Sequence, residues 1–309
     1  MRISSVTFYS GGELVSGSLR LPDRKGKYPG IVQGPGWMGV KDANLYLSYH
    51  EALTNSGFAV LVIDYRGFGD SGGPRGLLSP TAQLEDLQNA VTFMTAQNEI
   101  DKSRLGVFGT GGTGGGNAVL LSAADDRILC AVSQVPVADG KDWLRRMRSE
   151  DDWYKYLQRL ADNRVRLVTT GQGDLVDPTE EIMVATPERR SSQIKKDVAD
   201  SVPKEVPLAA ADEILSYRPI DSAPMSRKLL VIAVENDAVT PTDHAIALYD
   251  AAPPPKKLIL QRNTTHYAAY AEYAHVIIPA IIAWFTEHLI SSAIDEVTPE
   301  GVRMLAEAP

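Results

Sequence analysis

The stretch RLGVFGTGGTGGGNAVLL, residues 104–121, decides the fold class because an apolar run leads through a glycine-rich turn into a helical pattern. Six of the eight residues at positions 109–116 are glycine. Glycine loses more conformational freedom on folding than any other residue, so this concentration indicates a sharp turn or a close backbone approach. Such a turn either cradles a ligand with its backbone N–H groups or presents a catalytic side chain.

The ligand cradle is suggested by Gly109, Gly111 and Gly114, which match G-x-G-x-x-G, the pattern of a dinucleotide-binding loop. In such a loop, backbone N–H groups and the N-terminus of the following helix bind the pyrophosphate. Asp139 ends the next apolar run, at a spacing suitable for a ribose contact. A dinucleotide-binding fold begins near its fingerprint, however, whereas several strand-like runs precede this one. A dinucleotide-binding oxidoreductase is therefore the less favoured alternative.

Composition and charge restrict the class of partner. The chain has 309 residues, of which 44% are hydrophobic, enough to bury a large core. It contains 31 Lys and Arg residues and 39 Asp and Glu residues. The resulting net charge of -8 disfavours nucleic acid and anionic membranes as partners. We therefore expect a small-molecule substrate, and a homodimer is left open. No cofactor is expected, and no metal, because the histidines lack metal-ligand spacing and the lone Cys130 excludes a thiolate cluster.

The first residues and the single cysteine bear on the cellular compartment. The N-terminal sequence MRISSVTFYSGGELVSG alternates like a strand and lacks the charged and apolar regions of a secretory signal. No run reaches the roughly 18 apolar residues of a membrane span. Cys130 lies in the apolar run ILCAVSQVPV and is expected to be a buried, unpaired thiol. These features predict a cytoplasmic protein.

Short apolar runs alternate with helical patterns, which predicts an α/β protein whose mostly parallel sheet is covered by helices on both faces. Residues 6–22 alternate around a Gly-Gly pair and predict an antiparallel hairpin at the sheet edge. One helix is well marked, since Ser79 is placed to cap it and Pro80 to begin it. Its apolar stripe consists of Leu84, Leu87, Val91 and Met94. The sheet runs are residues 28–33, 58–65, 104–109, 128–137, 228–235 and 256–261.

The pattern changes between residues 140 and 222. This segment contains KDWLRRMRSEDDWYKYLQRL and the charged stretch ERRSSQIKKDVAD, which are helical in character and lack buried-strand runs. We interpret residues 140–222 as a helical cap inserted into a sheet domain that comprises residues 1–139 and 223–309.

Four segments, taken in order, resemble the α/β-hydrolase family, particularly the bacterial esterases and carbon–carbon bond hydrolases that carry a helical cap. They are FAVLVIDYRGFGDSGGP at residues 58–74, the glycine-rich stretch, KLLVIAVENDAVTP at residues 228–241 and NTTHYAAY at residues 263–270. The resemblance covers nearly all of the chain outside the cap. It implies the α/β-hydrolase fold, and the family order of nucleophile, acid and histidine along the chain.

By this resemblance, Asp237 and His266 are the catalytic acid and base, because each follows a buried strand. An imidazole accepts a proton near neutral pH, and a carboxylate fixes its tautomer and stabilises the imidazolium that forms. A turn aspartate and a surface histidine are the alternative interpretation of this pair. His50, His244, His275 and His288 lie in helical stretches and are expected to be structural.

The segment QGPGWMGVKD, residues 33–42, resembles the oxyanion loop of the family, with Pro35 in place of the usual histidine. An oxyanion hole needs preorganised N–H groups near the developing negative charge, and a tight glycine-rich turn supplies them. The resemblance implies the N–H groups of Trp37 and Gly112 as donors. An ordinary Gly-Pro turn with a core tryptophan is the alternative.

The family nucleophile can be placed in two registers, and neither contains a serine. Counted from the strand, Gly109 is the first small residue and Gly111 occupies the nucleophile position. Counted from the helix, Thr113 is the nucleophile between Gly111 and Gly115. The turn strains its central residue in a way that a β-branched side chain tolerates poorly, so the Gly111 register is favoured. One sequence does not distinguish a natural glycine from an engineered removal of serine.

Three functions remain open at this point. The first is hydrolysis of an ester, amide or activated carbon–carbon bond by Thr113 or by a water that His266 deprotonates. The second is a non-covalent lyase or isomerase that uses the same pair, and the third is a ligand-binding pseudo-hydrolase. Aromatic side chains are expected to line the substrate pocket or, equally, to form the cap core; they are Trp143, Trp153, Tyr267 and Tyr270.

Overall fold

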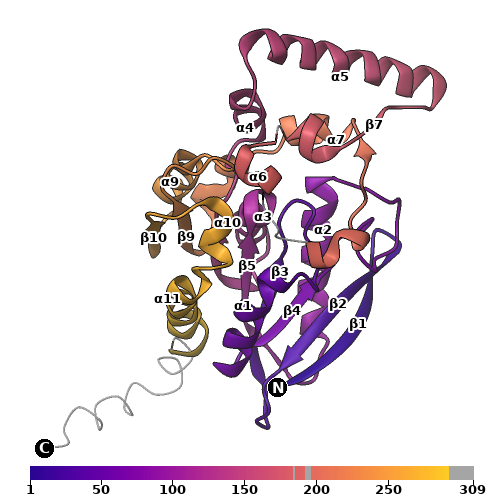
Figure 1. Cartoon of the computed structure of the whole chain (residues 1–309). Helices are drawn as coiled ribbons and strands as arrows, with labels where there is room; N and C mark the ends of the chain where they lie inside the picture. Colours follow the sequence, from indigo (N-terminus) through magenta and orange to yellow (C-terminus); the bar gives the residue numbers. More distant parts are fainter. Residues whose placement is uncertain (184, 192–195, 292–309) are drawn as a thin grey trace, which may run out of the picture.

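The computed structural model describes residues 1–183, 185–191 and 196–291 of the chain. Within these residues the central sheet has eight strands in the order β1-β2-β4-β3-β5-β6-β9-β10 (Figure 1). The β1 and β2 strands form the predicted antiparallel hairpin at one edge, and all pairs from β4 to β10 are parallel. The strands are β1 (Arg2–Ser10), β2 (Glu13–Leu21), β3 (Tyr28–Gly34), β4 (Ala59–Ile63), β5 (Ile100–Thr110), β6 (Ile128–Gln134), β9 (Lys228–Val234) and β10 (Lys256–Gln261).

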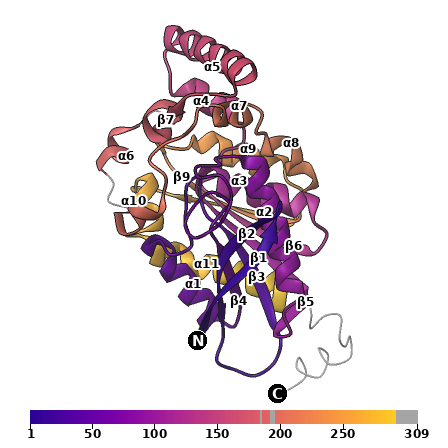
Figure 2. The ribbon, with the colours of Figure 1, turned by 90° about the vertical axis from the view of Figure 1, so that its right-hand side faces the viewer.

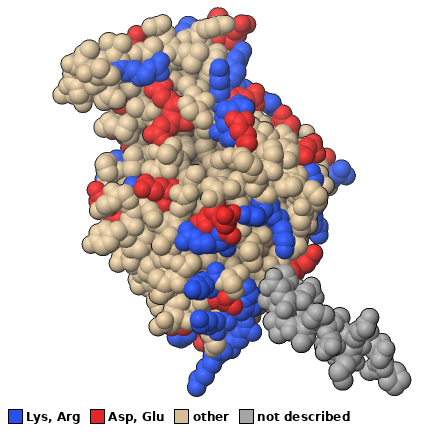
Figure 3. Space-filling view, turned by 180° about the vertical axis from the view of Figure 1, so that it is seen from behind, with Lys and Arg blue, Asp and Glu red and all other residues tan. Residues whose placement is uncertain are grey.

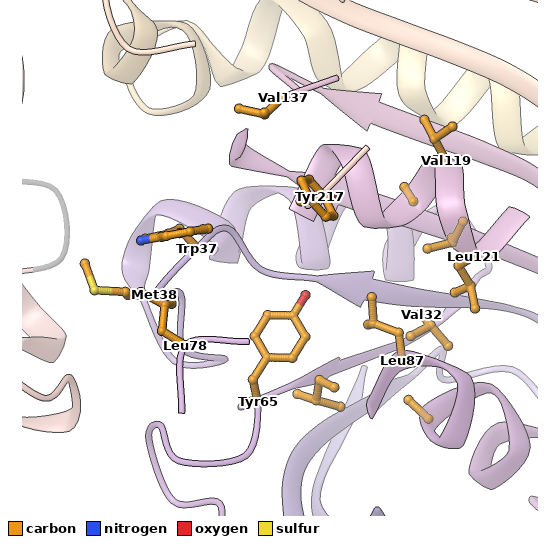
Figure 4. Packing of buried hydrophobic residues seen from close by; sticks show 14 of the residues in the cluster. Val32, Trp37, Met38, Tyr65, Leu78, Leu87, Val119, Leu121, Val137 and Tyr217 are labelled. Carbon is orange, nitrogen blue, oxygen red and sulfur yellow. The ribbon is translucent and has the colours of Figure 1, made fainter. Parts of the chain in front are cut away.

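Helices cover both faces of the sheet, as the sequence predicts. One core packs α1 (Asn44–Asn55) and α11 (Ala274–Thr286) against the sheet, and the other packs α2 (Pro80–Thr95), α3 (Gly111–Ala124) and α9 (Thr242–Ala251). Figure 4 shows part of the second core, where Val32 of β3, Leu87 of α2 and Leu121 of α3 lie close together. None of the described helices combines the length and the apolar character needed to cross a membrane.

The start of α2 confirms the capping prediction. The Ser79 hydroxyl accepts a hydrogen bond from the Ala82 N–H at 3.1 Å, and Pro80 begins the helix. Such a cap is worth about 1 kcal/mol relative to alanine. Leu87, Val91 and Met94 are fully buried, and Leu84 packs at the margin of the same core.

The chain leaves the sheet after β6 and returns at β9. The intervening segment lies at one end of the sheet, with its longest helix at the top of the molecule (Figures 1 and 2). It contains α4 (Gly140–Arg146), α5 (Glu150–Thr170), η1 (Pro178–Ile182), α6 (Pro187–Ser191), η2 (Lys196–Ser201), α7 (Ala210–Leu215), α8 (Pro219–Ser222) and η3 (Ala223–Met225). It also contains an antiparallel pair, β7 (Leu175–Val176) and β8 (Val206–Pro207), which the sequence analysis missed because two-residue strands are too short to show alternation.

The glycine-rich stretch spans the end of β5 and the first turns of α3, and its glycines permit close backbone approaches. A Cβ atom on Gly109 would lie 1.9 Å from the carbonyl oxygen of Gly114. On Gly115 it would lie 2.8 Å from the carbonyl oxygen of Gln134, at the end of β6. Both distances are far below van der Waals contact, so α3 reaches this position only because these residues lack side chains.

We predict that Gly109→Ala destabilises the protein severely, because the added methyl group meets a backbone oxygen that cannot rotate away. Overpacking a buried site costs about 1–3 kcal/mol, and this case belongs at the upper end. Gly173→Ala is the matched control, since the atoms nearest to its methyl group belong to side chains, Asn163 Oδ1 at 3.3 Å and Leu167 Cδ1 at 3.5 Å. Urea unfolding measures both. Equal unfolding free energies would contradict the proposed role of Gly109.

Candidate active site

A cavity of about 240 Å³ lies at the C-terminal edge of the parallel strands, where open α/β sheets bind their ligands. Its walls come from the loop after β3, the turn between β5 and α3, the loop after β9, the start of α10 (His266–Tyr270) and the segment between β6 and β9. The lining residues are Gly36, Trp37, Met38, Leu45, Tyr46, Thr110, Gly111, Gly112, Trp143, Thr179, Glu180, Met183, Ala185, Arg189, Arg190, Val239, Thr240, His266 and Tyr267.

Asp237 and His266 lie side by side, 29 positions apart in the sequence, and His266 lines the cavity. The His266 Nδ1 atom lies 2.7 Å from Asp237 Oδ2, and both side chains are almost completely buried. An ionised carboxylate at this distance accepts the Nδ1 proton, which fixes the tautomer and makes Nε2 the basic nitrogen.

The Asp237 carboxylate is held by its own turn. Its Oδ1 atom accepts hydrogen bonds from the N–H groups of Val239 at 2.7 Å and Thr240 at 2.9 Å. Burial opposes ionisation of Asp237, but His266 and these N–H donors outweigh burial and keep the pKa of Asp237 below its ordinary value. The carboxylate is therefore ionised at neutral pH and suited to stabilise a charged imidazole.

Gly111 stands at the sharp turn between β5 and α3. Its φ of +76° lies in the left-handed region, which a glycine enters without steric cost. A Cβ atom at Gly111 would lie 3.1 Å from Gly36 Cα and would meet no other residue closely. The turn has room for a small side chain beside the loop that carries Trp37.

Thr113 lies two residues further, inside α3, with 1% of its surface exposed. It does not line the cavity, and its hydroxyl has no hydrogen-bond partner among the described residues. Gly112, in contrast, lines the cavity in the first turn of α3, where backbone N–H groups have no partner within the helix. The backbone of Gly111 and Gly112 thus faces the cavity, while the Thr113 side chain is enclosed by the core.

The loop after β3 is fixed by side chains from two other segments. The Tyr65 hydroxyl donates to the carbonyl oxygen of Pro35 at 3.1 Å, and Gln83 Nε2 donates to that of Trp37 at 3.1 Å. Gln83 comes from α2 and is almost fully buried. These contacts fix the two peptide groups on either side of the one that carries the Trp37 N–H, so the orientation of this loop is preorganised.

The comparisons with known proteins show the family and the fold. Residues 11–268 match the sequence profile of the X-Pro dipeptidyl-peptidase (S15 family). A relative from Escherichia coli, an uncharacterized 31.7 kDa protein in the traX-finO intergenic region, is 30% identical over 290 residues, which cover 92% of this chain and 99% of the relative. The chain belongs to the S15 family. It is therefore an α/β-hydrolase, as the sequence resemblance implies.

Two further relatives lie in the same fold class. A thiohydrolase from Eupenicillium brefeldianum is 25% identical over 280 residues, which cover 83% of this chain and 85% of the relative. The solved structure of DcsB with its substrate analogue matches with a TM-score of 0.81 at 20% identity, covering 93% of this chain and 99% of that chain. This member of the S15 family is a hydrolase.

In this hydrolase, the loop after β3 and the start of α3 are joined by a chain of buried side chains. Asn117 Nδ2 donates a hydrogen bond to Gln83 Oε1 at 3.5 Å, and Asn117 Oδ1 accepts one from the Tyr217 hydroxyl at 2.9 Å. That hydroxyl also lies 3.0 Å from the carbonyl oxygen of Thr113. A Cβ atom on Gly116 would lie 2.3 Å from the Tyr217 hydroxyl, so this glycine admits the tyrosine. The tyrosine connects the segment between β6 and β9 to the site.

The predicted aromatic residues divide into two groups. Trp143 lines the cavity, where its ring meets Trp37 edge-on at 5.6 Å and its Nε1–H donates to the Val239 carbonyl oxygen at 2.9 Å. Trp153 does not line the cavity and packs on Tyr156 within α5. The side chain of Tyr270 lies outside the described residues.

Tyr267 meets the His266 ring edge-on at 4.9 Å and is held by α6. Its N–H donates to Glu188 Oε1 at 2.9 Å, and Arg189 Nε donates to its hydroxyl at 3.3 Å. The sequence analysis missed Glu188 and Arg189, because a charged stretch normally indicates a solvated helix face. No local signal in the sequence distinguishes these two residues from their charged neighbours.

The other histidines have local partners. His50 Nε2 contacts Gln33 Oε1, and burial, together with the charge of Arg20, lowers the pKa of His50 to about 3. His244 Nε2 lies 2.8 Å from Asp142. No cluster of potential metal ligands is found among the described residues.

Asp139, the residue considered for a ribose contact, has a structural role. Its carboxylate caps α4 by accepting a hydrogen bond from the Asp142 N–H at 3.0 Å, and it forms an ion pair with Arg218. The S15 family assignment and these contacts of Asp139 leave the dinucleotide-binding interpretation without support.

We predict that Gln83→Met slows turnover without weakening substrate binding. The change keeps the length of the side chain but removes the donor to the Trp37 carbonyl oxygen, so kcat should fall while KM stays unchanged. Loss of the buried hydrogen bond should also lower the unfolding free energy by about 1–3 kcal/mol. Gln88→Met, on the less buried side of α2, is the control. A stability loss with unchanged kcat would show that Gln83 only packs.

Proposed function

We propose that this S15-family protein hydrolyses the ester or thioester bond of a small acyl substrate by a water molecule that His266 activates. The observation that carries the proposal is the position of Gly111. It occupies the sharp turn at the cavity, beside the Trp37 loop and opposite the buried Asp237–His266 pair, and it brings no nucleophilic side chain. Base, acid and N–H donors remain available around a turn that offers only backbone.

Groups of the cavity supply each proton transfer and hydrogen bond that the proposed reaction needs. His266 Nε2 accepts a proton from water while the water oxygen attacks the carbonyl carbon. The N–H groups of Trp37 and Gly112 donate to the oxyanion of the tetrahedral intermediate. The bond from carbon to sulfur or oxygen then breaks, and His266 returns the proton to the departing thiolate or alkoxide. An acid and a thiol or alcohol are released, and the imidazole is neutral again.

An ester or thioester suits this mechanism better than an amide. Water activated by a histidine is a weaker nucleophile than a serine held at the turn, so the leaving group must depart readily. A thiolate does so, whereas an amine must first be protonated. The name of the Eupenicillium relative, a thiohydrolase, supports the same substrate class.

We infer that residues 140–222 act as a cap over residues 1–139 and 223–309, and that the cap selects the substrate. Trp143, Met183 and Arg189 come from this segment and line the cavity. The apolar surfaces of Trp143 and Met183, together with the Trp37 ring, favour contact with an apolar acyl chain.

We predict that Trp143→Ala changes the preference among acyl chain lengths, because it removes part of the cavity wall. Trp153→Ala is the matched control. Trp153 packs outside the cavity, so its truncation should lower stability by about 3–5 kcal/mol and leave the substrate preference unaltered. Relative kcat/KM values over a series of thioesters measure the difference. An identical chain-length preference in the unaltered protein and both variants would contradict the inferred role of Trp143 in the cavity wall.

We predict that His266→Ala lowers turnover of activated thioesters by about 10²–10⁴-fold, the usual contribution of general base catalysis. Asp237→Asn should also lower turnover, because an amide does not favour the required tautomer. Circular dichroism serves as the control for folding. Full activity in a folded His266→Ala protein would overturn the proposed function, and ligand binding without turnover in the unaltered protein would identify a binding protein.

We predict that Gly111→Ser converts the enzyme to covalent catalysis. The serine hydroxyl would stand at the turn between His266 and the two N–H donors, so esterase activity should rise strongly with a burst of product. A serine-directed phosphonate should label this variant and not the unaltered protein. Thr113→Ala should have little effect on turnover. Loss of activity in Thr113→Ala, or phosphonate labelling at Thr113, would instead establish a threonine nucleophile.

A further inference from the structure

The 21-residue helix α5 has one face packed on the protein and one face turned to solvent. Trp153, Tyr156, Leu160 and Asn163 are buried on the inner face. The last turns lack buried contacts, since residues 164–170 are all exposed and Arg164 and Arg166 form exposed ion pairs with Asp212 and Asp174. Figures 1 and 2 show α5 as the outermost element at the top of the molecule. Helical turns without tertiary packing are marginal in water, so this extension indicates a missing contact.

The outer face carries apolar side chains at regular spacing. Tyr154 is 63% exposed, Val165 62% and Val168 84%, and Ala161 is half-buried between them. Together with Gln158, these residues are spaced alternately four and three positions apart. This spacing is typical of the residues that form the interface of a coiled coil. The projecting end of α5 is largely uncharged (Figure 3). An apolar seam of this kind on a free helix marks an interaction surface.

We propose that α5 pairs with α5 of a second copy of this chain in antiparallel orientation, about a two-fold axis between residues 159 and 160. In this register Tyr154 packs on Val165 of the second copy, Gln158 packs on Ala161, and Val168 lies beside Asp151 in the first turn of the second α5. The Tyr154–Val165 and Gln158–Ala161 layers each occur twice by symmetry, so this central part of the surface is complementary to itself. The small Ala161 lets the two helices approach near the axis.

Charge supports the same register. Lys155 and Asp162 flank the seam on one side and are both exposed. Antiparallel pairing about this axis places Lys155 beside Asp162 of the second copy, twice. Within the described residues Lys155 forms no ion pair, while Asp162 accepts only the intrahelical hydrogen bond from Gln158 at 2.9 Å. A parallel pair would place Lys155 of one copy and Asp162 of the other on opposite sides of the seam, so this ion pair would be lost.

The surface is one helix wide, so the dimer is concentration-dependent rather than permanent. It lies on the outer side of α5, away from the cavity lining, and does not depend on the proposed reaction. Turnover of the unaltered protein and of surface variants therefore reports on the active site separately from assembly.

Sedimentation equilibrium of the full chain tests the assembly. We expect a monomer–dimer equilibrium, a tenfold or greater weakening in Val165→Glu, and no change in Glu99→Gln, a control far from α5. Lys155→Glu and Asp162→Lys should each weaken the dimer, and the double exchange should restore it. A monomer at all concentrations, or a dimer unaffected by these changes, would overturn the proposal.

Disulfide trapping tests the register. Cys130 is the single cysteine and is fully buried, so an introduced thiol reacts alone. Tyr154→Cys and Val165→Cys proteins should form a mixed disulfide with each other under mild oxidation. Neither should trap its own kind, because identical positions lie about 16 Å apart along the antiparallel axis at 1.5 Å per residue. Trapping of Val165→Cys with itself, without the mixed product, would overturn the antiparallel register.

Discussion

The close approach of the first turns of α3 to the ends of the neighbouring strands is the constraint on which the site depends. Side chains at Gly109 and Gly115 would collide with backbone oxygens, and a side chain at Gly36 would lie 3.0 Å from the carbonyl oxygen of Thr110. Because all three are glycine, the sharp turn at Gly111 sits directly beside the Trp37 loop. The glycine-rich stretch thus serves close packing as much as conformational freedom.

The supports of the site come from separate parts of the fold. Asp237 is held by its own turn after β9, the Trp37 loop by α2, and Tyr267, next to His266, by α6. None of these supports passes through a side chain at position 111. A missing side chain there therefore leaves the Asp237–His266 pair and the Trp37 loop in place, whereas loss of a supporting residue would move them. This separation is why the site keeps its geometry around a glycine.

The sequence predicts the fold and brings Asp237 and His266 to the same edge of the sheet, because both follow from local signals. Apolar runs mark the strands, Ser79 and Pro80 mark a helix start, and Asp237 and His266 each follow a strand whose end lies at the same sheet edge. The supports were not predictable in this way. Tyr217 reaches Thr113 across 104 residues, and a buried hydrogen bond between distant segments leaves no periodic pattern in the sequence.

The segment between β6 and β9 joins the outer helix to the cavity wall. Arg159 of α5 forms an ion pair with Glu181 at 2.6 Å, and Arg148 donates to the backbone carbonyl oxygen of Glu181 at 2.8 Å. The adjoining residues Glu180 and Met183 line the cavity. Exposed ion pairs contribute little to stability, so these contacts alone hold the wall weakly. Most of the support for this wall therefore comes from Ile182 and Met183, whose side chains are buried in the core.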